Sequence, residues 1–173
     1  MTTGGQGQGK SVPSVPDVKF GLVFQCETLS VPVMRRVLGD TLRGLGMDEE
    51  SVFDILLAAT EACTNVLRHG GRRLTGYAVV TSLGAVGCQV EVADEGVGIT
   101  NLAERRASAV PERRPADIPL AQLPESGRGL AVMRACVDQV TLDSRPGRGT
   151  VVVMHKQISW SQDAPLRQLQ AAS

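Results

Sequence analysis

The sequence has few aromatic residues, no excess of either charge and no long apolar run. Its 173 residues include only one Trp, one Tyr and three Phe, so the core must be built from aliphatic side chains and Met. The formal net charge is zero, which gives no long-range attraction to nucleic acid. No run approaches about 18 consecutive apolar residues, so no membrane span is predicted. We therefore expect no direct nucleic-acid partner and no membrane partner.

The four cysteines lack the spacing of a metal or redox motif. Cys26, Cys63, Cys88 and Cys136 lie far apart, and no two form a Cys-x-x-Cys pair. Each stands in an apolar stretch, which predicts small buried side chains in a reducing compartment. The N-terminus has neither the basic start nor the apolar run of a signal peptide. These features predict a cytoplasmic protein.

The length predicts one domain with loose ends. Residues 1–17 are rich in Gly, Gln, Ser and Pro, which predicts a disordered N-terminal tail. Residues 18–157 carry the apolar patterns of a folded domain. Within it, periodicity disappears over about residues 100–126, a segment rich in Arg and Pro that predicts a lid or a disordered loop. The polar C-terminal tail, 158–173, is expected to be loosely held.

Apolar periodicity predicts the order strand, helix, helix, strand, strand, lid, helix, strand, strand. Asp48 is predicted to cap the second helix. This order predicts an α+β fold, a two-layer sandwich of a mixed, mostly antiparallel sheet with helices on one face. The predicted strands cover residues 20–26, 77–83, 88–94, 140–142 and 150–156, and the predicted helices cover 30–44, 48–70 and 129–137.

Polar residues of the second predicted helix form the first candidate site. Glu61 and Asn65 are four residues apart and therefore share one helical face. Asn65 offers a neutral oxygen that can ligate Mg²⁺ without repelling phosphate. Glu61 could accept the proton of a group attacking a γ-phosphate, and Arg68, one turn further, could reach a phosphate oxygen. The same spacing is common on solvated helices, so this pattern alone carries little weight.

A predicted strand ends at Asp94 and is followed by Gly96 and Gly98. Asp94 lies on the apolar face of its strand, and a buried acid is costly unless it is paired. An adenine amino group is a suitable donor to it. The two glycines permit a tight turn and the close approach of a ligand. The alternative is an acidic β-turn that binds nothing.

Two further glycine motifs follow. Gly127, Gly129 and Leu130 stand at the start of a predicted helix, where backbone N–H groups favour an anion, although a hinge is the alternative. Residues 147–149 precede Thr150 at the start of the last strand, and a simple hairpin turn is the alternative there. Neither a Walker P-loop nor a dinucleotide fingerprint is present.

Together and in this order, the four motifs resemble the N, first glycine, second glycine and Gly-Thr boxes of the ATPase/kinase superfamily of gyrase, Hsp90, histidine kinases and MutL. The resemblance covers about residues 20–157 and implies a Bergerat-type fold that binds ATP and Mg²⁺. Within this superfamily, residues 61–65, the pair His69 and Gly70, and residues 126–129 are similar to the bacterial anti-sigma-factor serine/threonine kinases.

The resemblance implies an ATP-binding anti-sigma factor that phosphorylates an anti-sigma-factor antagonist in a bacterial partner-switching system. Its implied site roles extend to every motif. In the first motif, Glu61 would be the general base, Asn65 the Mg²⁺ ligand and Arg68 a phosphate contact. Asp94 would bind the adenine amino group beside Gly96 and Gly98, and Thr150 would complete the adenine contact through a water. Gly127 and Gly129, followed by Leu130, would anchor the lid.

One alternative function stays open at the level of sequence, namely a switch module that binds ATP to shape a partner surface and transfers nothing. The two functions differ at Glu61, which only the kinase requires. The implied partners are a sigma factor and its antagonist, with a homodimer as a further expectation. Residues 29–45 could form the dimer or sigma-binding face, although the apolar stripe of this predicted helix could equally be core.

Overall fold

The computed structural model describes residues 18–71, 74–85, 87–99, 125–158, 160 and 163–171. The predicted N-terminal tail, and all of the predicted lid except its last two residues, lie outside the described residues. The helices and strands run as follows: β1 Val18–Gln25, α1 Ser30–Gly44, α2 Glu49–His69, β2 Gly76–Leu83, β3 Gly87–Asp94, α4 Glu125–Cys136, β4 Gln139–Ser144, β5 Thr150–Gln157 and α5 Pro165–Ala171.

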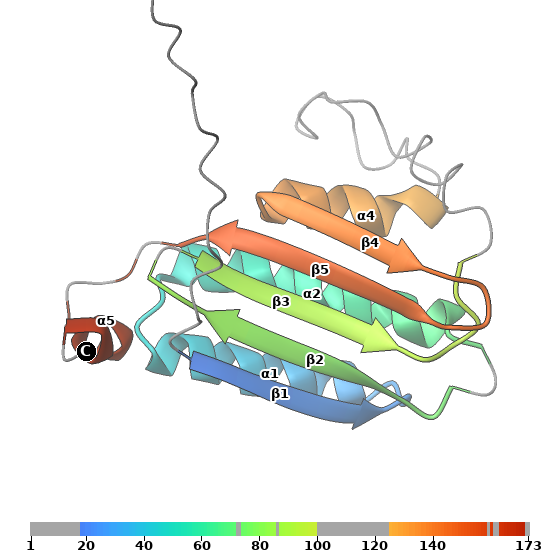
Figure 1. Cartoon of the computed structure of the whole chain (residues 1–173), viewed down its shortest axis with the longest axis horizontal. Coiled ribbons are helices and arrows are strands. Elements are labelled where there is room, and N and C mark those ends of the chain that lie inside the picture. Colours follow the sequence, from blue (N-terminus) through green and yellow to red (C-terminus); the bar gives the residue numbers. More distant parts are fainter. Residues whose placement is uncertain are drawn as a thin grey trace, which may run out of the picture.

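Five strands form one sheet in the order β1-β2-β3-β5-β4, and α1, α2 and α4 lie on one face of it (Figure 1). The predicted α+β sandwich is therefore confirmed. The expectation of a mixed sheet is wrong in one respect, since every pair of neighbouring strands is antiparallel. The crossover through α4 does make β3 and β4 parallel, but β5 lies between them and pairs with both.

Helix α2 is the central helix of this layer and packs against α1, α4 and the sheet. It begins as predicted, because the Asp48 side chain accepts a hydrogen bond from the backbone N–H of Ser51 at 2.8 Å. Glu49 and Glu50 occupy its first turn, where the helix dipole favours acidic side chains. Asp48 and these two acidic residues therefore stabilise the start of α2.

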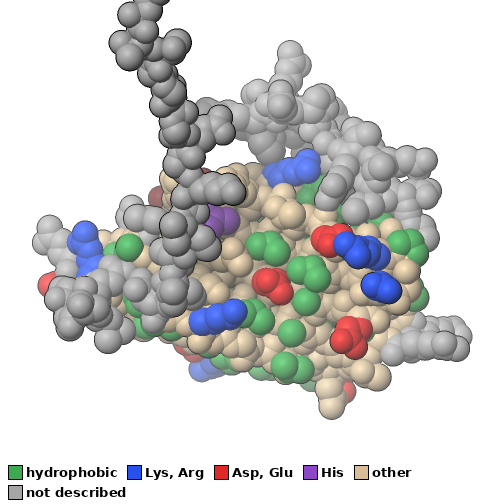
Figure 2. Space-filling view, in the orientation of Figure 1, with side chains coloured by type: hydrophobic (Ala, Val, Ile, Leu, Met, Phe, Trp, Pro, Cys, Tyr) green, Lys and Arg blue, Asp and Glu red, His purple; other side chains and the backbone are tan. Residues whose placement is uncertain are grey.

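The other face of the sheet is not covered by any described helix. Figure 2 shows this face, on which charged and hydrophobic side chains are interspersed. Alternation along β1 places Val23 there with 83% of its surface exposed, while Leu22 and Phe24 turn toward the core. None of the helices in the described part has the length and apolar character needed to cross a bilayer.

The core contains the aliphatic side chains that the sequence predicted, together with three of the four cysteines. Cys63, Cys88 and Cys136 are buried, Cys26 is half-buried, and all four are free thiols. Burial raises the pKa of the Cys63 and Cys88 thiols to about 12, which keeps them protonated. The cysteines are therefore small core residues, as expected.

The segment after β5 is not the loosely held tail that its polar composition suggested. It contains α5, in which Leu166 is fully buried, and Ala164 just before it is 1% exposed. Trp160 bridges to Met47, and its indole N–H donates to the carbonyl of Gly84 at 3.4 Å. Three apolar residues, Ala164, Leu166 and Trp160, thus hold this polar segment against the core, which average composition does not reveal.

Replacing Leu166 with Ala is expected to lower the free energy of unfolding by about 2 kcal/mol, because it leaves a cavity where α5 meets the core. Urea denaturation followed by circular dichroism measures this change. Gln168→Ala, on the exposed side of the same helix, is the matched control and should change the stability by less than about 0.5 kcal/mol. Equal stability of the Leu166 variant and the wild type would contradict docking of α5.

Candidate functional site

A pocket lies between α2, α4 and one end of the sheet, and residues from all four sequence motifs line it. Those residues are Asn65 of α2, Asp94 and Gly98 at the end of β3, Gly129 and Leu130 of α4, and Thr150 of β5. Much of the remaining wall is apolar, formed by side chains such as Val92, Met133 and Val152. An apolar cleft with a few polar groups at fixed positions is the usual form of a small-molecule site.

Asp94 supplies a buried acceptor to this pocket. Only 8% of its surface is exposed. Its Oδ1 accepts a hydrogen bond from the backbone N–H of Gly96 at 2.7 Å, and the backbone N–H of Thr150 also stabilises the charged carboxylate by hydrogen bonding. Burial raises the pKa of Asp94, and these two hydrogen bonds oppose the shift. The carboxylate is thus held in place by backbone groups and can accept from the exocyclic amine of a ligand.

Glu61 and Asn65 meet α4 at Gly129. A Cβ atom at Gly129 would lie 3.1 Å from Oε2 of Glu61 and 3.1 Å from Nδ2 of Asn65. The missing side chain therefore lets the first turns of α4 approach this polar pair closely. Exposed N–H groups at the start of a helix favour an anion. A carboxylate and an amide of α2 thus face α4 at Gly129, near the start of that helix, at one side of the pocket.

Helix α4 begins earlier than the sequence indicated, at Glu125 instead of about residue 129. Gly127 and Gly129 therefore lie within its first turns. The prediction placed the start at Gly129. Glycine is a poor helix former, but the packing of α4 against α2 outweighs that preference.

The loop after β3 is held between α2 and the β4–β5 turn. The carbonyl of Gly70, at the end of α2, accepts a hydrogen bond from the N–H of Val97 at 3.2 Å. On the other side, the N–H of Gly147 donates to the carbonyl of Val97 at 2.8 Å. A Cβ at Gly96 would collide with Gly70, so this loop and the end of α2 fit only without a side chain there. The first glycine motif and the Gly-Thr motif are therefore one packed unit.

Gly149→Ala is expected to lower the free energy of unfolding by about 3 kcal/mol. Gly149 has a φ of +82°, and a Cβ there would collide with the backbone carbonyl of Asp94. Gly147 is the matched control, because its φ of +74° is similar but a Cβ would meet nothing within 4 Å. Gly147→Ala should cost only about 1 kcal/mol. Equal losses in the two variants, measured by urea denaturation, would contradict this close packing.

Four predicted site residues lie outside the pocket lining. Glu61 is half-buried beside it, and Gly96 is buried behind Asp94. Arg68 is exposed on the last turn of α2, so its phosphate contact stays a prediction. Gly127 lies in α4, two residues before Gly129, the first residue of this helix in the lining.

Sequence reasoning missed three residues of this region as site residues. His69 and Gly70 line the pocket at the end of α2. From the sequence, this pair was recognised only as part of the family resemblance and was given no role in the site. Ser144 ends β4, and its Oγ lies 2.8 Å from Oγ1 of Thr150. The only sequence signal for Ser144 was a polar residue shortly before the Gly-Thr motif, because the register that pairs it with Thr150 becomes visible only in the sheet.

A family model of the histidine kinase-like ATPase domain matches residues 24–156. The chain belongs to this family. Membership in the histidine kinase-like ATPase family implies the use of ATP, and it agrees with the resemblance carried by the four motifs.

Two anti-sigma F factors are among the similar proteins. The one from Bacillus velezensis is 33% identical over 118 residues, which cover 67% of this chain and 75% of the relative. The one from Clostridium acetobutylicum is 32% identical over 117 residues, or 66% of this chain and 76% of the relative. The serine-protein kinase RsbW of Bacillus thuringiensis is 29% identical over 136 residues, covering 76% and 80%.

A solved structure shares the fold. The crystal structure of the RsbU and RsbW domains of a Mycobacterium tuberculosis protein superposes with a TM-score of 0.59 and 18% sequence identity. The match covers 83% of this chain and 33% of that chain. At this identity the likeness concerns the fold alone, and it agrees with the histidine kinase-like architecture described above.

Proposed function

We propose that residues 18–157 form a cytoplasmic ATP-binding anti-sigma factor with serine/threonine kinase activity, which phosphorylates an anti-sigma-factor antagonist. The names of the relatives, anti-sigma F factor and serine-protein kinase RsbW, support this proposal. The observation that carries it is the convergence of Glu61 and Asn65 at Gly129, on a pocket that also contains the buried acceptor Asp94.

The proposed orientation of ATP follows from the polarity of the pocket. Asp94 would accept from the adenine amino group, with Thr150 beside it and the apolar wall against the base. The triphosphate would then lie toward the start of α4, where N–H groups favour an anion and where Gly127 and Gly129 carry no side chain to obstruct it. Gly98 and Leu130 line the space between these ends.

Asn65 is the proposed ligand of a Mg²⁺ ion that accompanies ATP. No group of three or more His, Cys, Asp or Glu side chains that could hold a metal occurs in the described part of the chain. A single amide oxygen, that of Asn65, fits Mg²⁺, because this ion commonly takes one or two protein oxygens and completes its shell with phosphates and waters. Asn65 lines the pocket and offers such an oxygen. When bound, the ion neutralises charge on the phosphates.

Glu61 is the proposed general base. Its carboxylate lies against Gly129, one turn of α2 from Asn65, and is half-buried. From there it can accept the hydroxyl proton of a serine or threonine while that oxygen attacks the γ-phosphorus and ADP leaves. A switch that only binds ATP has no use for this carboxylate, and a relative named as a serine-protein kinase favours phosphate transfer.

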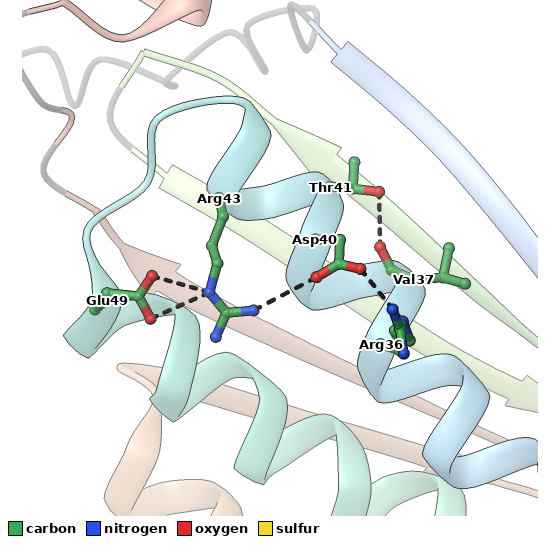
Figure 3. Close-up of polar contacts among 6 residues, drawn as sticks. All are labelled: Arg36, Val37, Asp40, Thr41, Arg43 and Glu49. Carbon is green, nitrogen blue, oxygen red and sulfur yellow. Dashed lines mark hydrogen bonds and ion pairs between the residues drawn. The ribbon is translucent and has the colours of Figure 1, made fainter.

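The outer face of α1 is the proposed partner surface. Met34, Leu38 and Leu42 are fully buried, so the main apolar stripe of this helix is core. A second strip remains outside, with Val33 at 52% and Val37 at 38% exposure. Charged residues continue this strip: Arg36 and Arg43 each form an ion pair with Asp40, and Arg43 also pairs with Glu49 (Figure 3).

Exposed ion pairs of this kind contribute little to the free energy of unfolding. Their charged side chains can therefore pair with a partner protein instead at little cost to the fold. We propose that this strip, the α1 surface, contacts the sigma factor or the antagonist. The alternative is that a second copy of this chain binds the same surface and forms a homodimer, which a binding experiment can distinguish.

Incubation with γ-labelled ATP and candidate antagonist proteins tests the kinase proposal. Label is expected on a serine or threonine of one antagonist, and co-purification of a sigma factor should depend on nucleotide. A matched incubation with α-labelled ATP controls for binding without transfer. Failure to label any antagonist, despite measurable ATP binding, would leave only the switch function.

A further inference from the structure

Ser144 lies behind the pocket, outside its lining. It ends β4 and pairs in register with Thr150 of β5, which pairs in turn with Asp94 of β3. Residues directly opposite one another in neighbouring strands point to the same face of the sheet. Three polar side chains therefore form one row across three strands, on the helix-covered face where the pocket lies.

The Ser144 hydroxyl makes three hydrogen bonds at this end of the sheet. Its Oγ accepts from the backbone N–H of Ile99 at 2.7 Å and donates to the carbonyl of Gly149 at 3.1 Å. It also lies 2.8 Å from Oγ1 of Thr150. Ile99 and Thr150 both line the pocket, so one hydroxyl outside the lining holds two residues within it.

Either hydroxyl could donate in the bond between Ser144 and Thr150, but only one arrangement of protons satisfies all three contacts of Ser144. A serine hydroxyl has one proton, and Ser144 donates it to Gly149. Thr150 must then donate to Ser144, and its Oγ1 presents only a lone pair to the pocket. The carboxylate of Asp94 in the same row is an acceptor as well. The polar end of the pocket therefore presents two acceptors.

We propose that Ser144 is a positioning residue that fixes the Thr150 hydroxyl as an acceptor and thereby makes the pocket prefer a 6-amino purine to a 6-oxo purine. The inference rests on the proposed ATP site and names the residue that sets its base selectivity. Adenine, directly or through a bound water, offers donors to this edge. Hypoxanthine instead presents a carbonyl oxygen toward the two acceptors, which leaves buried polar groups unpaired. Without Ser144, the Thr150 hydroxyl can rotate and donate.

The test measures the Kd values for ATP and inosine triphosphate by isothermal titration calorimetry in Mg²⁺ buffer. Ser144→Ala should weaken ATP binding about tenfold and leave inosine triphosphate within about twofold, so the preference falls about tenfold. Ser144→Thr keeps the hydroxyl and should keep the preference. Thr141→Ala removes an exposed hydroxyl from the other face of β4 and is the matched control.

A double-mutant cycle with Thr150→Val separates positioning from a general loss of stability. In the Thr150→Val background, Ser144→Ala should not change the ATP preference further, because the two residues act through one bond. The preference is a ratio within one variant, so reduced stability alone does not alter it. Additive effects, or an unchanged preference in Ser144→Ala, would overturn this inference alone. A wild-type chain that binds neither nucleotide would overturn the proposed function as well.

Discussion

Asn65→Ala is expected to weaken ATP binding in Mg²⁺ buffer by about 100-fold, the largest binding effect of any single side chain in the pocket. The amide lines the pocket beside Gly129, and it is the proposed protein ligand of the metal that the triphosphate carries. Even the loss of an outer-shell partner of a metal ligand commonly reduces metal affinity by about 10- to 100-fold, so the loss of the ligand itself is expected to reach the upper end of that range. Isothermal titration calorimetry with and without Mg²⁺ measures the change.

The dependence on Mg²⁺ distinguishes a lost ligand from a damaged fold. Wild-type affinity should fall when the metal is chelated, whereas the Asn65→Ala affinity should hardly change because its metal contact is already absent. Gln89→Ala, an exposed substitution on β3 far from the motifs, is the matched control and should bind like the wild type. An Asn65 variant that keeps both its affinity and its Mg²⁺ dependence would show that the metal is held elsewhere.

Glu61→Gln is expected to lower the rate of phosphate transfer by about 10³-fold while leaving the Kd for ATP within about threefold of wild type. Glutamine keeps the size and most contacts of the side chain beside Gly129 but cannot accept the hydroxyl proton. Single-turnover transfer from γ-labelled ATP to the antagonist measures the rate, and calorimetry measures the affinity on the same preparation.

A loss of the phosphate-transfer rate without a loss of ATP affinity distinguishes a kinase from a switch that only binds ATP. If Glu61→Gln transfers phosphate at the wild-type rate, the carboxylate is not the base. If the variant loses ATP binding together with transfer, Glu61 supports the pocket and takes no specific part in the chemistry. Glu50→Gln, an exposed change in the first turn of the same helix, should affect neither quantity.

Much of this site could be predicted from the sequence because its motifs are local. Helical periodicity alone places Glu61 and Asn65 on one face of α2. Asp94 ends a strand in which buried and less buried residues alternate, and it lies on the buried face. The order of the four motifs along the chain then matched the order of the boxes in a known family. The structure adds the distances between them, above all the closeness of Gly129 to both α2 side chains.

The features that were missed depend on contacts between distant segments. Ser144 acquires its partners only when β4 pairs with β5, so no local pattern identifies it. The order of the elements predicted a mixed sheet, but β5 pairs between β3 and β4, so no two neighbouring strands are parallel. Likewise, the docking of α5 depends on the burial of Leu166, and the mostly polar composition of the segment does not reveal that burial.

The central claim is that the pocket bounded by Asn65, Asp94 and Gly129 binds ATP with Mg²⁺. Calorimetric titration of the wild-type chain with ATP in Mg²⁺ buffer, repeated with Asp94→Asn, tests it most directly. The account predicts saturable one-to-one binding that is much weaker in the Asp94 variant, because the amide presents a donor toward the adenine amino group. Absence of saturable binding by the wild type, or equal affinity of the two chains, would contradict it.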